Sequence, residues 1–222
     1  MDFSEVVRQI EQFIYELFMW VIFYPATLFR VVFRPSRMMD YVRGELMISP
    51  DVAFGSAIRP PLFLFLSIAI GSIIAPISAA QTLAFSEDAF GRWLTASWFN
   101  LLMFRTLGFS VYALVGALLF DWITPGSITR DTLKLPFYQQ CYIVGPFALV
   151  LSPTLVRLDS GNGALLFVIL ALQLWLYVGQ VLFFRRLAAA GWVKAMLLAG
   201  VVLLVGNLNL VLATLMASAF MG

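Results

Sequence analysis

The polar side chains that could carry chemistry in this chain are few, and most of them fall within long apolar runs. One of them is a charge, Arg105, which lies well inside such a run. The others are amides: Asn100, Gln139, Gln140, Gln173, Gln180, Asn207 and Asn209. A polar group in hydrocarbon is costly unless it pairs with a neighbouring helix or lines a cavity. These residues are therefore the candidates for an intramembrane polar site.

Arg105 has two interpretations. Its guanidinium either meets a partner or cavity, or reaches the lipid headgroups along its flexible stem. Three acidic residues on the same predicted side of the membrane are the possible counter-charges: Glu87, Asp88 and Asp159. No Asp or Glu falls at mid-span, which argues against a proton relay or a sodium-coupled carrier.

The amides are predicted to serve helix packing, because amides in membranes most often hydrogen-bond across helices. The densest group is the segment GNLNL, residues 206–210. Asn207 and Asn209 are two positions apart, so they cannot share one helical face. They either serve two neighbouring helices or lie where a broken helix lines a cavity.

Several classes of chemistry are excluded by the residue types themselves. The chain has no histidine, so histidine-ligated haem, zinc and copper sites are ruled out. Its single cysteine, Cys141, permits neither an internal disulfide nor a thiolate cluster. There is no phosphate-binding glycine loop and no nucleophile–base pair. We therefore predict no catalytic residue, no metal and no cofactor, and a net charge of only +2 gives no reason to expect nucleic acid.

The surrounding composition is that of a polytopic membrane protein. Only 12% of the residues are charged and 62% are hydrophobic, whereas soluble domains are about 25% charged. A helix of roughly 20 apolar residues crosses the bilayer. Five runs fit, which predicts an all-α bundle of five spans: Leu62–Ala80, Ser97–Phe120, Phe137–Val156, Ala164–Phe184 and Ala195–Phe220.

The first 59 residues are predicted to form a separate cytoplasmic and interfacial segment, followed by a five-span domain over residues 60–222. Residues 2–17 have apolar residues at helical spacing and polar residues on the opposite face, which predicts an amphipathic helix. The apolar stretch that follows runs only from Leu17 to Phe29, and Pro25 is expected to kink it. For residues 13–33 we favour an interfacial helix over a true span.

The basic residues set the predicted orientation. Eleven of the 14 Lys and Arg residues fall in the N-terminal segment and in the loops on its side of the membrane. This asymmetry places the N-terminus in the cytoplasm and, with five spans, the C-terminus on the far side. The same side carries a cluster that also suits anionic lipid headgroups: Arg30, Arg34, Arg37 and Arg43. Short loops without a sorting tail favour a bacterial inner membrane, with a periplasmic C-terminus.

Two sequence elements resemble the Yip-domain family of membrane proteins. One is the aromatic and basic stretch YPATLFRVVFRPSRMMDYVRGEL at residues 24–46. The other is CYIVGP, in which Tyr142 and Pro146 match a tyrosine-x-x-x-proline element early in the third span. The similarity covers roughly residues 25–220 and implies a cytoplasmic N-terminal segment followed by five clustered spans. Eukaryotic members of the family bind Rab GTPases, and this chain lacks their DLYGP element.

These observations predict a non-enzymatic accessory or scaffolding protein. It would pack against a membrane protein partner or against itself, and contact anionic lipid headgroups on the cytoplasmic side. The alternative is a lipid or small-solute permease, with Arg105, Asn207 and Asn209 lining the path.

Overall fold

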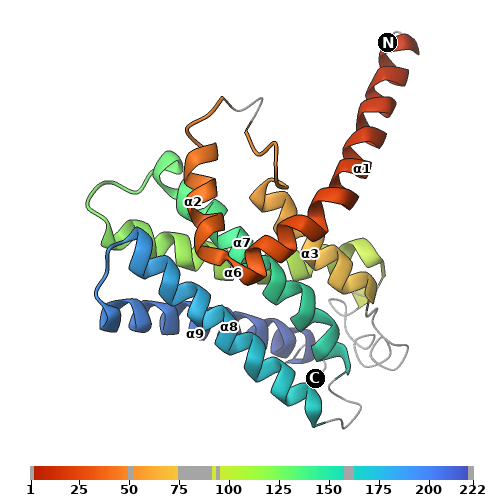
Figure 1. The fold of residues 1–222 in the computed structure, drawn as a ribbon. Helices are drawn as coiled ribbons and strands as arrows, with labels where there is room; N and C mark the ends of the chain where they lie inside the picture. The colour runs from red at the N-terminus through yellow and green to blue at the C-terminus, as the bar shows by residue number, and fades with distance from the viewer. Residues whose placement is uncertain (1–2, 50–52, 75–91, 94–95, 158–162, 220–222) are drawn as a thin grey trace. The chain divides into compact units, whose positions relative to one another are not determined.

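The computed structural model describes residues 3–49, 53–74, 92–93, 96–157 and 163–219 (Figure 1). These residues form seven helices and no strand. The predicted all-α class is therefore confirmed for the described part of the chain. Contacts group the chain into two compact units, Met1–Arg59 and Pro60–Gly222.

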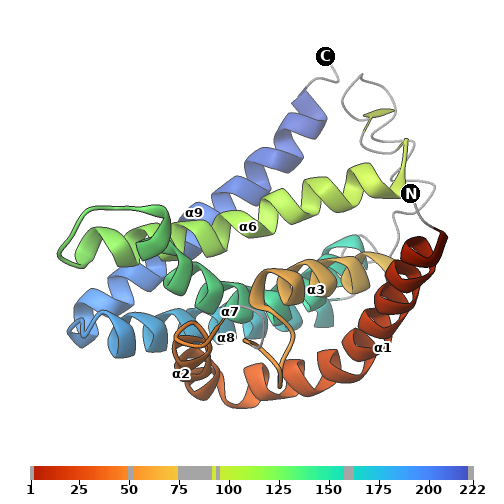
Figure 2. The ribbon, with the colours of Figure 1, turned by 90° about the horizontal axis from the view of Figure 1, so that it is seen from above.

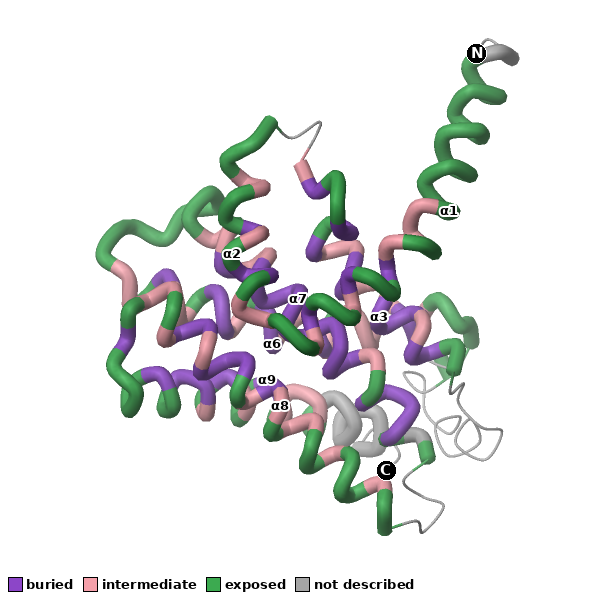
Figure 3. Tube along the Cα trace, viewed as in Figure 1, coloured by how far each residue is buried: buried purple, intermediate pink, exposed green. Residues whose placement is uncertain are grey.

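The first unit contains α1 (Phe3–Phe33) and α2 (Pro35–Glu45). The sequence predicts a kink at Pro25, and α1 is continuous through that residue. The helix bends along its length (Figures 1 and 2), and a proline within a helix is a recognised cause of bending. Pro35 occupies the first turn of α2, where its missing N–H is not needed. Residues 5–18 of α1 are exposed (Figure 3).

The second unit is a bundle built around α7 (Arg130–Arg157). Helices α3 (Pro60–Ile74), α6 (Trp98–Ile123) and α8 (Ala164–Leu187) pack against α7, and α9 (Trp192–Ala219) packs against α6 and α8. Residues 139–148 of α7 are all buried (Figure 3). The core of the unit therefore lies along this helix.

Two glycines allow α3 and α7 to approach closely. A Cβ atom at Gly71 would lie 2.8 Å from the Leu149 carbonyl oxygen, and one at Gly145 would lie 2.5 Å from the Phe63 ring. Small residues at such contacts are typical of helices that associate in membranes.

Among the described residues, four helices are long and apolar enough to cross a membrane: α1, α6, α8 and α9. They make the chain compatible with an integral membrane protein. The described part of α3 is shorter, and residues 75–80 of its predicted span lie outside the described residues. Helix α7 carries three prolines and is not among the four. The count of five spans stays a prediction. Helix α1 is long and apolar enough to be a span, whereas its sequence favoured an interfacial helix.

Helix α7 also begins earlier than predicted. The third apolar run was expected to start at Phe137, with Arg130 and Lys134 in a preceding loop. Instead the helix begins at Arg130. Thr129 stabilises this start, because its Oγ1 accepts a hydrogen bond of 3.2 Å from the backbone N–H of Thr132. Both basic residues are therefore on the helix.

Candidate functional site

Two buried glutamines join α7 to α8. The side-chain amides of Gln140 and Gln180 donate to each other's oxygen at 2.8 and 2.7 Å. Neither residue has any exposed surface. Gly116 of α6 lies against the same amide, and a Cβ atom there would overlap Gln140. Three helices therefore meet at this pair, and the adjacent Gln139 is also buried.

Asn207 joins α9 to two other helices. Its Oδ1 accepts hydrogen bonds from the Tyr112 hydroxyl of α6 and from Gln173 Nε2 of α8, each at 2.8 Å. Its Nδ2 donates to Gln173 Oε1 at 3.3 Å. Gly206 lets the Tyr112 ring pack against α9, because a Cβ atom at that position would overlap the ring.

Asn209 makes a different contact. Its Nδ2 donates to the backbone oxygen of Gly108 on α6 at 3.2 Å. The structure therefore brings Gln173 and Asn207 together. Asn209, which is also on α9, bonds separately to the backbone of α6. In each case the bond runs between helices.

Arg105 is partly buried on α6. Its Nη1 atom is buried and has no hydrogen-bond acceptor among the described residues. The predicted counter-charges Glu87, Asp88 and Asp159 lie outside those residues. The pairing of Arg105 with one of these carboxylates stays a prediction.

The four arginines of the N-terminal cluster differ in their contacts. Arg30 is in α1, and its Nη1 donates to the Ser56 carbonyl oxygen at 2.8 Å. Arg34 is at the N-cap of α2, with Arg37 and Arg43 within that helix. These three side chains are exposed. Arg30 is exposed as well, so the four arginines differ in that Arg30 also contacts the loop.

Further bonds hold residues 54–58 onto α1 and α2. Thr27 Oγ1 accepts from the Ile58 N–H at 3.2 Å, and the Glu45 carboxylate accepts from the Phe54 N–H. The Tyr41 hydroxyl accepts from the Ser56 hydroxyl at 3.1 Å. Partial burial raises the pKa of Tyr41, so this phenol stays protonated at neutral pH.

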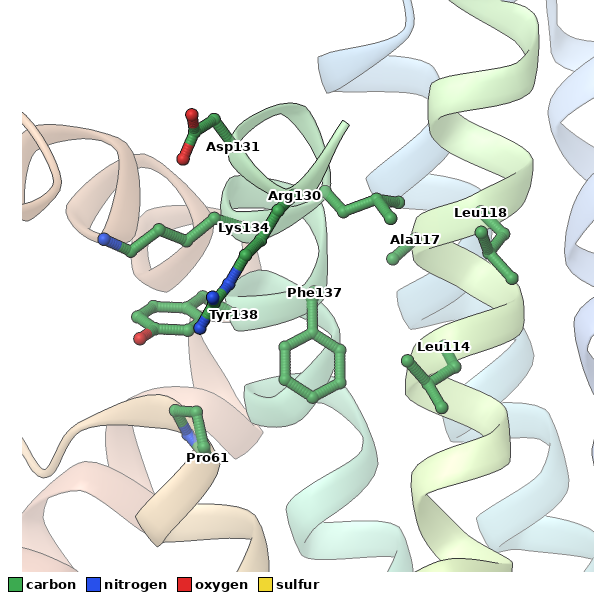
Figure 4. A pocket seen from close by; sticks show the side chains of 10 residues that line it. Pro61, Leu114, Ala117, Leu118, Arg130, Asp131, Lys134, Phe137 and Tyr138 are labelled. Carbon is green, nitrogen blue, oxygen red and sulfur yellow. The ribbon is translucent and has the colours of Figure 1, made fainter. Parts of the chain in front are cut away.

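A cavity of about 820 Å³ lies in the second unit and was not predicted from the sequence. Helix α7 contributes residues of both kinds, basic and apolar, and α6 contributes an apolar wall (Figure 4). The full lining is Pro61, Leu114, Ala117, Leu118, Arg130, Asp131, Leu133, Lys134, Phe137 and Tyr138. The available signal was the four-residue spacing of Arg130, Lys134 and Tyr138, which puts them on one helical face. Treating the first two as loop residues concealed it.

In the described residues, the fold and these contacts define a helical protein that is compatible with an integral membrane protein and is held together inside by amide hydrogen bonds. Within the described residues, no group of three or more His, Cys, Asp or Glu side chains could hold a metal ion. No family model matches the chain, and neither does any curated protein or solved structure.

Proposed function

We propose that this protein is a non-enzymatic integral membrane protein that acts as an accessory or scaffolding component. It packs against a membrane protein partner or against a second copy of itself. The observation that carries the proposal is the use of the interior amides, which bond between helices and so fix the bundle.

The permease hypothesis finds less support. A transport path needs polar groups that are available to the solute. Asn207 is occupied by Tyr112 and Gln173, and Asn209 is occupied by Gly108. Rocking of one helix against another would break these bonds and the tight contacts at Gly116 and Gly206. A fixed bundle suits a structural role better than alternating access.

The N-terminal two thirds of α1 form the surface that we assign to the partner. Its apolar side chains are strongly exposed, with Phe18 and Ile22 each 65% exposed. An amphipathic helix of this kind inserts its apolar face into the membrane interface or into a groove of another protein. In the proposed topology, α1 is interfacial, five spans follow, and the N-terminus is cytoplasmic. The resemblance to the Yip-domain family also implies the cytoplasmic N-terminus and the five spans.

The scaffold proposal is tested by native mass spectrometry of the full-length protein extracted in nanodiscs. We expect a companion protein, or a second copy, at a constant stoichiometry. The variant Phe18→Ser/Ile22→Ser should reduce its recovery by at least fivefold. The control Leu170→Ser/Leu174→Ser changes two residues of α8 that have the same spacing and are each 64% exposed. Its recovery should stay within twofold, and equal losses in both variants, or a monomer without companions, would refute the proposal.

The topology is tested by thiol labelling in a Cys141→Ser background. Cysteines introduced at Ser4 and Ser36 should both react with an impermeant maleimide from the cytoplasmic face. A cysteine at Gly222 should react from the opposite face. Labelling of Ser4→Cys and Ser36→Cys from opposite faces would make α1 a span.

A further inference from the structure

We propose that the cavity between α6 and α7 binds one anionic phospholipid. Its phosphate contacts Arg130 and Lys134, and one acyl chain lies along Leu114, Leu118 and Phe137. This site is separate from the arginine cluster of residues 30–43 and does not depend on the scaffold role.

The charged end of the cavity favours an anion. It carries two cations, Arg130 and Lys134, and one carboxylate, Asp131, all of them exposed. Figure 4 shows the Asp131 carboxylate directed away from Phe137, whereas Arg130 extends along α7 on the side of Tyr138. A guanidinium binds phosphate through two parallel hydrogen bonds, and a lysine adds a mobile positive charge.

A second carboxylate, that of Asp121, is not among the residues that line the cavity. Asp121, at the end of α6, is buried, and its Oδ2 accepts a hydrogen bond of 2.7 Å from Thr132 Oγ1. Thr129 and Thr132 also bond each other across the first turn of α7. These contacts hold the start of α7 against α6. The two cations are therefore carried by a fixed helix and not by a loose loop.

The apolar end of the cavity favours a lipid over a water-soluble phosphate. Leu114 and Leu118 are one turn apart on α6 and remain 48% and 44% exposed. Figure 4 shows the Phe137 ring in the space between α7 and Leu114. A soluble anion would leave this wall uncovered, whereas an acyl chain would cover it.

The position of the cavity matches the boundary between headgroups and hydrocarbon. Trp122 lies one turn beyond Leu118 on α6 and is 72% exposed. Exposed tryptophans are enriched at the membrane–water interface. The basic residues follow Trp122 in the chain and the two leucines of α6 precede it, so one amphiphile can contact both the charged and the apolar end of the cavity. In the predicted orientation this end is cytoplasmic, where anionic lipids attract basic residues.

The experiment uses the full-length protein in mild detergent, titrated with phosphatidylglycerol or phosphatidylcholine and followed by native mass spectrometry. We expect one phosphatidylglycerol per chain, bound at least tenfold more tightly than phosphatidylcholine. The variant Arg130→Gln/Lys134→Gln should weaken phosphatidylglycerol binding at least tenfold. The control Arg8→Gln/Lys194→Gln removes two exposed charges elsewhere and should change it by less than twofold. Equal weakening in both variants, or equal binding of the two lipids, would overturn the proposal.

Two further arms separate the parts of the site. The variant Asp131→Asn removes the opposing charge and should tighten phosphatidylglycerol binding about twofold to threefold, so it tests the sign of the effect even if the double variant folds poorly. The variant Leu114→Ala/Leu118→Ala should weaken binding severalfold through the acyl chain alone. Glycerol 3-phosphate should not displace the lipid. Displacement at similar concentrations, or no effect of the leucine changes, would instead assign the cavity to a soluble phosphate and overturn the lipid.

Discussion

In the second unit, Pro60–Gly222, side chains on different helices hydrogen-bond one another, whereas in the first unit side chains of α1 and α2 mainly bond the backbone of the loop that follows them. The bonds of the second unit join positions far apart in the chain: Gln140 and Gln180 are 40 residues apart, and Tyr112 and Asn207 are 95 apart. In the first unit, Glu45 and Phe54 are 9 apart, and Thr27 and Ile58 are 31 apart.

This difference in range has a consequence for stability. A bond between two helices forms only when both helices are in place, so its loss lowers the stability of the whole bundle. A bond from a helix to a nearby loop can open while the helix stays folded. We therefore expect the second unit to unfold as one cooperative body and the loop of the first unit to open locally.

The largest effect is expected where a glycine lets an aromatic ring pack against a helix. In Gly206→Ala, the new methyl group overlaps the buried Tyr112 ring, whose hydroxyl is held by Asn207. We expect a loss of about 1–3 kcal/mol in the free energy of unfolding. The measurement is helicity during titration with a denaturing detergent.

The matched control is Gly200→Ala in the same helix, where nothing lies within 4 Å of the new Cβ atom. It should leave stability unchanged or raise it by roughly 0.5–1 kcal/mol, because alanine restricts the unfolded chain. Equal destabilisation by the two alanines would show that the second unit does not depend on this contact.

A smaller effect is expected from the glutamine pair. Either Gln140→Leu or Gln180→Leu leaves one amide buried without its partner, which costs about 1–2 kcal/mol for a polar bond between membrane helices. The double variant should cost less than the sum of the two, with a coupling energy of about 0.6–1.7 kcal/mol as found for polar pairs in membranes. The exposed Gln12→Leu in α1 is the control and should change stability by less than about 0.5 kcal/mol. Additive single effects would mean that the two amides do not stabilise the bundle together.

The sequence was sufficient to predict that Gln140, Gln173, Gln180, Asn207 and Asn209 would bond between helices, but not with which partners. Hydropathy identifies which runs are apolar, and spacing says that Asn207 and Asn209 face different ways. Neither quantity says which neighbouring helix each face meets. The partner depends on how the helices pack in space. Gln140 and Gln180 are an example, since they are 40 residues apart and no local pattern links them.

The main error of sequence interpretation has a local cause. Arg130 and Lys134 suggested a loop because they are charged, yet Thr129 begins a helix that includes both. A hydropathy criterion ends a predicted helix at its first charged residues, whereas the real helix ends where its backbone hydrogen bonds end. The cavity was missed for this reason.

The smallest effect is expected in the first unit. In Thr27→Val, the Ile58 N–H loses its acceptor while the shape of this buried side chain is nearly kept. We expect a local loss of about 1 kcal/mol, because an unpaired buried donor costs roughly that much. Hydrogen–deuterium exchange should show about fivefold faster exchange at Ile58 and no change in α7. The control Thr106→Val removes a bond made only within α6, to the Leu102 carbonyl, and should leave Ile58 unchanged. If Thr27→Val instead accelerated exchange throughout α6, α7 and α9, the loop would be part of the same cooperative body, and the distinction between the two units would fail.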